Sequence, residues 1–550
     1  MVKPYLNQVG GKVENDVNLF TGGLNTYVDK GFIDADQMPY VMNMTMYQPP
    51  MISTRPTRRT MAYGFYPQIM PTLNTIVEMF AISENDILIV TTDGSTSTLR
   101  RLYRDGDHWS KQDVGTVPNA DHYFFTRCVI GPHRYIYIGN ESFKIRVDAT
   151  SFNPLTIKTY DDPGDSDHYG IPVWHKGRLW LARPSKNEVE WSNVLDPDDF
   201  LIGQDPQDPT HFGFSGTLYA NTAKGFIQNI VSFDDKLMIL CEHSIHAVYG
   251  SSGDATNQNY FQVVDVNNSL GVHSPTCIAV GGGRMFWLGD DYEVYEYTGS
   301  ALNMISRPAS TRYTTISKGG ISNLFTTEDN VDYNNNACMT ATATKLYFNI
   351  GLNDNRFLFV FDIFNKVWWC EDGEFTTIAD YSEIKNTILM AKPNGDILIS
   401  YERWGDGNDY VFNFDTSTIV EEPIKYEFHT RVYGADGTDS RKSISDVWFQ
   451  ASANATVYLS DIWTSRDKWK EYFGDEWALP AIENNYEPIG TLETKHQSVE
   501  QLQMYRDYSY EQQVCHVPKM YGERLNAFQI IVKGTGTSKF YLMKREWRAQ

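Results

Sequence analysis

Short runs in which apolar and polar residues alternate recur along most of the chain. In the stretch 284–299, RMFWLGDDYEVYEYTG, Phe286 and Leu288 fall on one face, and Val294 alternates with Glu293 and Tyr295. This spacing of two is typical of β-strands, whereas helical spacing is scarce. The GDD, PNGD and FDDK segments between such runs are typical of hairpin turns, because Gly, Asn and Asp accept positive φ. The pattern therefore predicts an all-β protein.

The alternating runs form a repeat. Each unit has a turn, a strand of apolar and aromatic residues, a second turn and another strand. The first apolar residues of seven such strands are Ile87, Tyr135, Leu179, Leu237, Met285, Leu346 and Ile388. Most of the separations between them match the ~40–50 residues of a four-stranded propeller blade, and loop insertions explain the longer ones. The repeat predicts a β-propeller of six or seven blades, whose ring closure leaves only short strand edges open.

The pattern changes after about Tyr410. Longer alternating strands are predicted over 426–434, 443–463, 512–536 and 538–547, with an acidic, polar insertion between Asp467 and Asp507. We expect a β-sandwich-like C-terminal domain there. The chain is thus divided into an N-terminal segment (1–60), an irregular propeller (61–410) and a β-rich C-terminal domain (411–550).

Composition and charge exclude several classes of function. The 550 residues carry a formal net charge of -22, which disfavours a general polyanion-binding role. The basic clusters RPTRR (Arg55–Arg59) and KREWR (Lys544–Arg548) are short, and we interpret both as solvated or ion-paired surface. Six widely spaced cysteines without a C-x-x-C pair predict reduced core thiols. No secretory signal or membrane-length apolar run is present in the sequence, so we expect a soluble protein that is not inserted into a membrane.

Candidate chemistry is sparse. Four adjacent carboxylate pairs lie in predicted turns, where Asp bonds its own backbone, and neighbours on a strand point to opposite faces: Asp161/Asp162, Asp198/Asp199, Asp234/Asp235 and Asp290/Asp291. His243 and His246 are three residues apart and do not suit a shared metal. Gly281–Gly283 precede a strand and not a helix, which disfavours a phosphate-binding loop. We expect no catalytic, metal or cofactor site, and this favours a structural or assembly role.

The opening stretch 18–56, NLFTGGLNTYVDKGFIDADQMPYVMNMTMYQPPMISTRP, resembles the N-terminal signature of bacteriophage tail nozzle proteins, the tail tubular protein B family, and of related packaged-DNA stabilisation and tail hub proteins. The chain departs from that signature at Pro56-Thr57, where the family usually has Gly. A second region, 223–306, is similar to the family in the order of its strand and turn motifs. The matching signature residues are Phe20, Gly22, Gly23, Leu24, Asn25, Ile33, Gln37, Asn43 and Arg55.

The resemblance implies a non-enzymatic virion protein, assembled in the host cytoplasm, that forms a hexameric ring below the portal and adaptor. Such a ring would line and close the DNA exit channel without cofactors, take part in genome ejection and pass the genome without reading its sequence. It would contact portal-side proteins and tail fibres or the tail tip. The N-terminal segment would either close the propeller beside the last blade or reach the adaptor. Two alternatives stay open: a virion-associated propeller that binds or cleaves host-surface glycans, and a baseplate or distal hub protein of a long-tailed phage.

Overall fold

The computed structural model describes most of the chain, and every structural statement below concerns the described residues. These are 13–48, 51–61, 75–106, 108–150, 155–160, 168–205, 208, 210–220, 222–308, 315–324, 331–332, 337–352, 355–382, 385–400, 406–434, 442–461, 469, 487–492, 512–517, 525 and 527–549. The predicted acidic insertion between Asp467 and Asp507 lies largely outside this set, as do Asp161 and Asp162.

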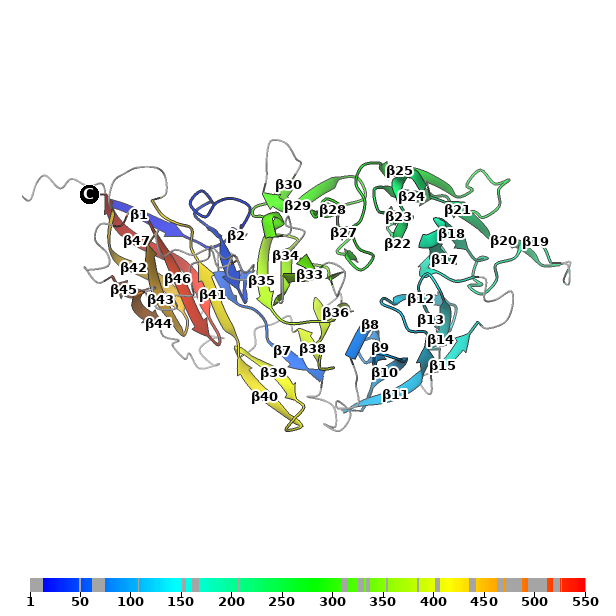
Figure 1. Ribbon diagram of the computed structural model, residues 1–550, viewed down its shortest axis with the longest axis horizontal. Helices are drawn as coiled ribbons and strands as arrows, with labels where there is room; N and C mark the ends of the chain where they lie inside the picture. Colours follow the sequence, from blue (N-terminus) through cyan, green and yellow to red (C-terminus); the bar gives the residue numbers. More distant parts are fainter. Residues whose placement is uncertain are drawn as a thin grey trace, which may run out of the picture.

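Seven sheets are arranged around a common centre and form a β-propeller (Figure 1). In the first four blades, antiparallel strands follow one another across each sheet in chain order, and short turns join most neighbouring strands. Their strands are β8 (Thr75–Ser83), β9 (Asp86–Thr92), β10 (Ser97–Asp105) and β11 (His108–Val117); β12 (Phe124–Ile130), β13 (His133–Gly139), β14 (Lys144–Asp148) and β15 (Thr156–Thr159); β16 (Ile171–His175), β17 (Arg178–Arg183), β18 (Glu188–Trp191) and β21 (Gly216–Tyr219); and β22 (Ile227–Phe233), β23 (Lys236–Cys241), β24 (Ile245–Tyr249) and β25 (Gln262–Asn267).

Blades five and six carry extra pairings at their edges. Blade five is β26 (Ile278–Gly281), β27 (Arg284–Leu288), β28 (Val294–Tyr297), β29 (Leu302–Pro308) and β30 (Thr315–Ser317). Blade six is β31 (Val331–Asp332), β32 (Cys338–Ala341), β33 (Lys345–Leu352), β34 (Asn355–Asp362) and β35 (Val367–Asp372). Three short 3-10 helices are described, η3 (Pro184–Lys186), η4 (Thr222–Lys224) and η5 (Ser322–Leu324).

The N-terminal part of the chain closes the ring. In blade seven, β36 (Thr377–Ser382), β37 (Thr387–Ala391) and β38 (Ile397–Ser400) are followed in space by β7 (Arg58–Thr60), which is antiparallel to β38. The hairpin β39 (Asn408–Asn413) and β40 (Thr418–Pro423) extends the same sheet. The inner strand β36 also lies against β8 of blade one. This confirms the first of the two roles expected for the N-terminal segment.

The repeat prediction is confirmed: all seven sequence markers lie on the second strand of a blade. They fall on β9, β13, β17, β23, β27, β33 and β37. Alternate residues of these strands enter the contacts between neighbouring blades, since a blade strand is covered on both faces. For example, Ile87 and Ile89 pack in the cluster between blades seven and one, whereas Leu88 and Val90 pack between blades one and two.

A two-sheet sandwich adjoins blade six on one side of the propeller (Figure 1). The predicted C-terminal sandwich is therefore present, but N-terminal strands complete both of its sheets. One sheet contains β1 (Val13–Asn18), β5 (Met44–Gln48), β6 (Met51–Thr54), β42 (Lys442–Ser452), β45 (Gln512–His516) and β47 (Lys539–Ala549). The other contains β4 (Tyr40–Met42), β41 (Lys425–His429), β43 (Ala455–Asp461), β44 (Glu487–Leu492) and β46 (Phe528–Thr535).

The domain boundaries in the structure differ from those predicted at residues 60 and 410. Residue 410 falls inside β39, and the sandwich begins with β41. Strands from residues 13–54 pair with strands from beyond residue 424, so the N-terminal segment is shared between sandwich and propeller. Aromatic side chains fill the space between the two sandwich sheets, as the edge-to-face contact of Phe428 with Phe540 at 5.0 Å shows.

Candidate functional site

The Gly-Gly-Leu-Asn turn of the opening stretch lies against blade six. β2 (Gly23–Leu24) pairs in parallel with β3 (Gln37–Met38), and β2 lies beside β35. Gly23 has φ +66°, and a Cβ there would lie 2.7 Å from the carbonyl oxygen of Trp368. A Cβ on Gly22 would lie 2.5 Å from Cγ of Gln37. Glycine is needed at both positions because the backbone approaches its neighbours closely.

Asn25 and Gln37 fix this turn with buried side-chain hydrogen bonds. Asn25 Nδ2 donates to Gln37 Oε1 at 2.7 Å, and Gln37 Nε2 donates to the carbonyl oxygen of Lys318 at 2.6 Å. Asn25 Oδ1 also accepts the backbone N–H of Tyr27 at 3.2 Å, as expected of Asn in a turn. The pair therefore ties the opening stretch to the loop that follows blade five.

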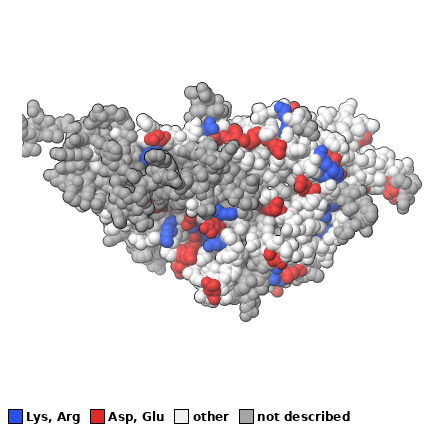
Figure 2. Space-filling view, viewed as in Figure 1, with Lys and Arg blue, Asp and Glu red and all other residues white. Residues whose placement is uncertain are grey.

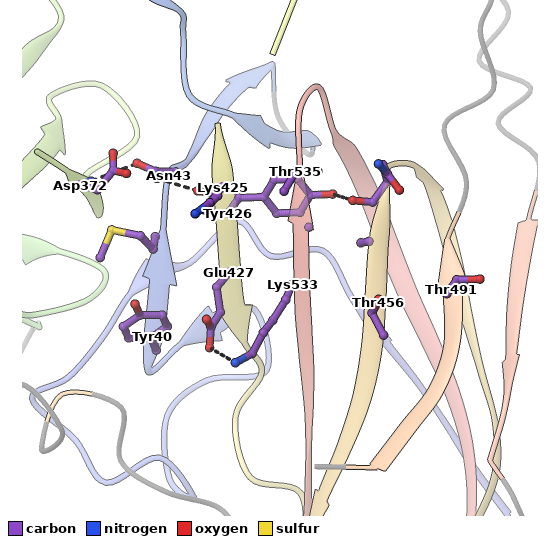
Figure 3. A pocket seen from close by; sticks show the side chains of 14 residues that line it. Tyr40, Asn43, Asp372, Lys425, Tyr426, Glu427, Thr456, Thr491, Lys533 and Thr535 are labelled. Atoms are coloured by element: carbon purple, nitrogen blue, oxygen red, sulfur yellow. Dashed lines mark hydrogen bonds and ion pairs between the residues drawn. The ribbon is translucent and has the colours of Figure 1, made fainter. Parts of the chain in front are cut away.

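Asn43 stands where the chain crosses from one sandwich sheet to the other, between β4 and β5. Its φ of +59° lies in the left-handed region, which Asn tolerates better than most residues. Its Nδ2 donates to the carbonyl oxygen of Lys425 at 2.6 Å, and its Oδ1 accepts the backbone N–H of Asp372 at 3.0 Å. Its own backbone N–H donates to Cys370 at 2.9 Å. One side chain thus joins the sandwich strand β41 to the propeller strand β35 (Figure 3).

Arg55 extends this connection. Its Nε donates to Asn43 Oδ1 at 2.9 Å, while its two terminal nitrogens bind the carboxylate of Asp409 at 2.9 and 2.6 Å. It also contacts Asp372 at 3.0 Å, and its side chain is only 2% exposed. A guanidinium matches a carboxylate with two parallel hydrogen bonds, which a lysine cannot reproduce.

Arg58 forms the second half of the network. It contacts Glu371 at 2.7 Å and lies over the ring of Phe375 at 5.1 Å. Its backbone N–H donates to Asp409 at 2.9 Å, so Asp409 holds both ends of the segment that leads into β7. The RPTRR cluster is thus ion-paired as interpreted, but Arg55 and Arg58 are buried and do not form solvated surface.

The electrostatics of this network follow from its burial. Burial alone would lower the pKa of Arg55, but the hydrogen bond to Asp409 and the charges of Asp372 and Asp409 raise it above its ordinary value. Burial would raise the pKa of Asp409, yet the hydrogen bond and charge of Arg55 hold that pKa below its ordinary value. Both groups therefore stay charged at neutral pH, and each depends on the other.

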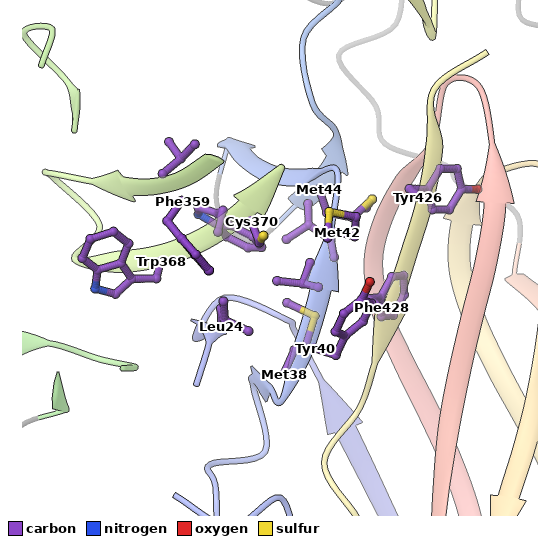
Figure 4. Close-up of a cluster of buried hydrophobic side chains, with 14 of the residues drawn as sticks. Leu24, Met38, Tyr40, Met42, Met44, Phe359, Trp368, Cys370, Tyr426 and Phe428 are labelled. Atoms are coloured by element: carbon purple, nitrogen blue, oxygen red, sulfur yellow. The ribbon is translucent and has the colours of Figure 1, made fainter. Parts of the chain in front are cut away.

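Apolar packing surrounds the polar network. Leu24, Met38 and Met44 pack with Trp368 and Cys370 of blade six, and Tyr426 and Phe428 of the sandwich border the same cluster (Figure 4). Phe20, with φ +58°, meets Phe428 edge-on at 5.2 Å, and Ile33 is also buried. The structure thus brings eight of the nine signature residues, all except Ile33, into one region, here called the junction: the contact of residues 18–58 with β35, β39 and β41.

A shallow groove of about 500 Å³ lies next to the junction on the outer face of the β41 sheet (Figure 3). Asn43 and Asp372 form one wall, and Lys425, Glu427, Lys533, Thr456 and Thr491 lie along its floor. Glu427 accepts hydrogen bonds from His429 at 2.6 Å and Lys533 at 3.4 Å. Most of the lining residues are polar, and Glu427 and Lys533 on the floor form an ion pair.

The other sequence candidates lie apart from the junction. Asp234/Asp235 and Asp290/Asp291 lie in turns, as predicted. Asp198 accepts the hydroxyl of Tyr137 and contacts Arg146, while Asp199 contacts His211. His243 and His246 bond different carboxylates, Asp290 and Asp265. All six cysteines are buried and unpaired, which confirms their expected place in the core.

Two further findings concern the described residues alone. They contain no group of three or more His, Cys, Asp or Glu side chains arranged to hold a metal ion. No helix among them is long and apolar enough to cross a bilayer.

The comparisons with known proteins bear on the fold. No protein-family model matches the sequence, and no curated protein matches it significantly. Among solved structures, Chaetomium thermophilum Raptor gives a TM-score of 0.39 at 10% identity over 64% of this chain and 29% of Raptor. YCF48 bound to D1 peptide gives 0.34 at 13% identity over 66% of this chain and 97% of YCF48. Human WBSCR16 gives 0.32 at 12% identity over 60% of this chain and 88% of WBSCR16. With such scores, the propeller assignment rests on the sheets themselves.

Sequence reasoning missed the partners of the signature residues. Asp372, Asp409 and the carbonyl of Lys318 are separated from them by about 280 to 354 residues, so no local pattern links them. The one indication in the sequence is the group of three arginines in RPTRR, two of which the structure shows to be buried and ion-paired.

Proposed function

We propose that this chain is a structural virion protein of a tailed bacteriophage, a nozzle or hub subunit that forms a ring around the DNA exit channel. One observation carries the proposal: eight of the nine residues that match the nozzle signature, all except Ile33, meet at the junction between propeller and sandwich. A motif that builds a rigid connection between two domains suits a load-bearing ring better than a ligand site.

The charge of the chain supports passage of DNA without binding. A formal charge of -22 on each copy would repel phosphates, so a ring of such subunits would let a duplex slide. Among the described residues on the face shown in Figure 2, acidic and basic groups are interspersed and no broad basic patch is seen. Other copies of the chain, portal-side proteins and tail fibres or tip are the proposed partners.

Native mass spectrometry of the purified chain tests ring formation, with the Arg55→Lys variant beside it to report whether the junction matters. A discrete hexamer with a 24-base-pair duplex left unbound at physiological salt supports the proposal. A monomer at every concentration, or tight duplex binding, contradicts it.

Closure of the channel is a separate part of the proposal. Loops or side chains facing the lumen would plug it until adsorption. Particles assembled without this subunit are then expected to lose their DNA, and particles that retain it would contradict the plug.

A further inference from the structure

A cavity of about 550 Å³ lies between blades two, three and four of the propeller. It opens where the inner strands β12, β16 and β22 begin, with Phe124, Ile171 and Ile227 among its lining residues. Loops of blades two, three and four and the residue Pro275 before β26 complete it. Its size falls within the roughly 300–1,000 Å³ of ligand sites.

One side of the cavity is apolar. Ile171 and Ile227 are buried at its base, and Pro184 and Pro275 add to the same surface. Phe226 lines the cavity with 51% of its surface exposed. A large aromatic side chain left half uncovered inside a concave site offers apolar area that a ligand could bury.

The other side carries negative charge and amide groups. Asp121 and Glu141 are exposed, and the described lining residues include no Lys or Arg. Burial lowers the pKa of His122, despite an opposing effect of Asp121, so this ring adds little positive charge at neutral pH. Asn140 Oδ1 accepts the backbone N–H and the hydroxyl of Ser142 at 2.8 and 2.9 Å. The amide N–H groups make only long bonds: Asn140 Nδ2 donates to the carbonyl oxygen of His122 at 3.5 Å, and Gln228 Nε2 donates to Glu242 at 3.4 Å.

From this lining we infer that the cavity binds a peptide segment bearing Lys or Arg next to an apolar residue. The apolar residue packs on Phe226 and Ile227, and the cation lies between Asp121 and Glu141. The amide N–H groups of Asn140 and Gln228 donate to carbonyl oxygens of the peptide backbone. The inference goes beyond the proposed ring function and does not depend on it, since the cavity lies within one propeller.

Fluorescence anisotropy on the full chain tests this with two labelled peptides, Ac-Phe-Lys-Leu-Lys-amide and Ac-Phe-Glu-Leu-Glu-amide. We expect the basic peptide to bind and the acidic one to bind at least about tenfold more weakly, with the difference shrinking at high salt. Phe226→Ala and the double variant Asp121→Asn/Glu141→Gln are each expected to weaken the basic peptide about tenfold.

Phe364→Ala is the control, because Phe364 is an exposed phenylalanine, at 71%, outside the cavity. It is expected to bind as the wild type does. Phe226 is exposed, so its removal leaves the core intact, and an unchanged unfolding midpoint verifies this. Equal binding of the two peptides, or full binding by Phe226→Ala, overturns the inference. So does maltohexaose that binds this cavity when the basic peptide does not.

Discussion

Blade one and the junction are built in opposite ways. Blade one uses four consecutive strands within residues 75–117, and turns of a few residues set its pairing. The junction joins residues 18–58 to β35, β39 and β41, which lie more than 300 residues further along the chain. Both regions have apolar packing and buried charge, but they differ in what the charges join. In blade one the buried pair of Arg101 and Asp86 links adjacent strands, whereas at the junction Arg55 binds Asp409 across 354 residues of sequence. Local order thus builds the ring, and long-range polar contacts join it to the sandwich.

The largest expected effect comes from Arg55→Ala. The change leaves Asp409 buried without its partner and removes the donor to Asn43, so we expect a loss of about 3–5 kcal/mol in the free energy of unfolding. Urea denaturation measures it, with Arg55→Lys as the control that keeps the charge and loses the paired hydrogen bonds. A loss below about 1 kcal/mol for Arg55→Ala would show that this network contributes little to the stability of the junction.

Gly23→Ala is expected to be the next most damaging. The new Cβ would meet the carbonyl of Trp368 at 2.7 Å and stand at φ +66°, for a cost of about 2–4 kcal/mol. Gly131→Ala in blade two has a similar φ of +57° with nothing within 4 Å, so its cost is about 1 kcal/mol. Thermal unfolding midpoints of the two variants separate the cost of the steric contact at Gly23 from the cost of positive φ, which both positions share. Equal midpoints would show that the contact with Trp368 adds no cost.

Glu78→Gln tests ring closure through pH. Glu78 on β8 accepts a hydrogen bond from Thr377 on β36 at 3.0 Å, and burial raises its pKa to about 7. A raised carboxyl pKa stabilises the fold at low pH, and this stability is lost as pH rises from about 4.5 through 7. The variant should therefore gain on the order of 1–2 kcal/mol over wild type at pH 8 and nothing at pH 4. If the free energies of unfolding of the two proteins changed in parallel with pH, Glu78 would not have a raised pKa in the folded protein.

Asp113→Asn should have the smallest effect. It breaks the pair with Arg100 at 3.1 Å within blade one, but the Asp113 side chain is 58% exposed. Exposed pairs contribute about 0–1 kcal/mol, so we expect a change within roughly 0.5 kcal/mol in urea denaturation. A change as large as that of Arg55→Ala would show that burial does not separate the two regions.

The sequence predicts the blades better than the junction for the same physical reason. A marker such as Ile87 or Leu237 reports a strand through its immediate neighbours, so its position in the blade follows from local spacing. The long gap between Leu179 and Leu237 holds an inserted hairpin, β19 (Ile202–Gln204) and β20 (Phe212–Phe214). By contrast, nothing near Arg55 indicates Asp409, and nothing in residues 13–54 reveals that they complete the sandwich.

Cryo-electron microscopy of the purified chain and of the virion that contains it tests the central proposal most directly. We expect a sixfold ring on the tail axis, with the propeller and sandwich of each subunit held in the relative orientation fixed by the junction. Isolated copies at the periphery, around a fibre, would contradict it.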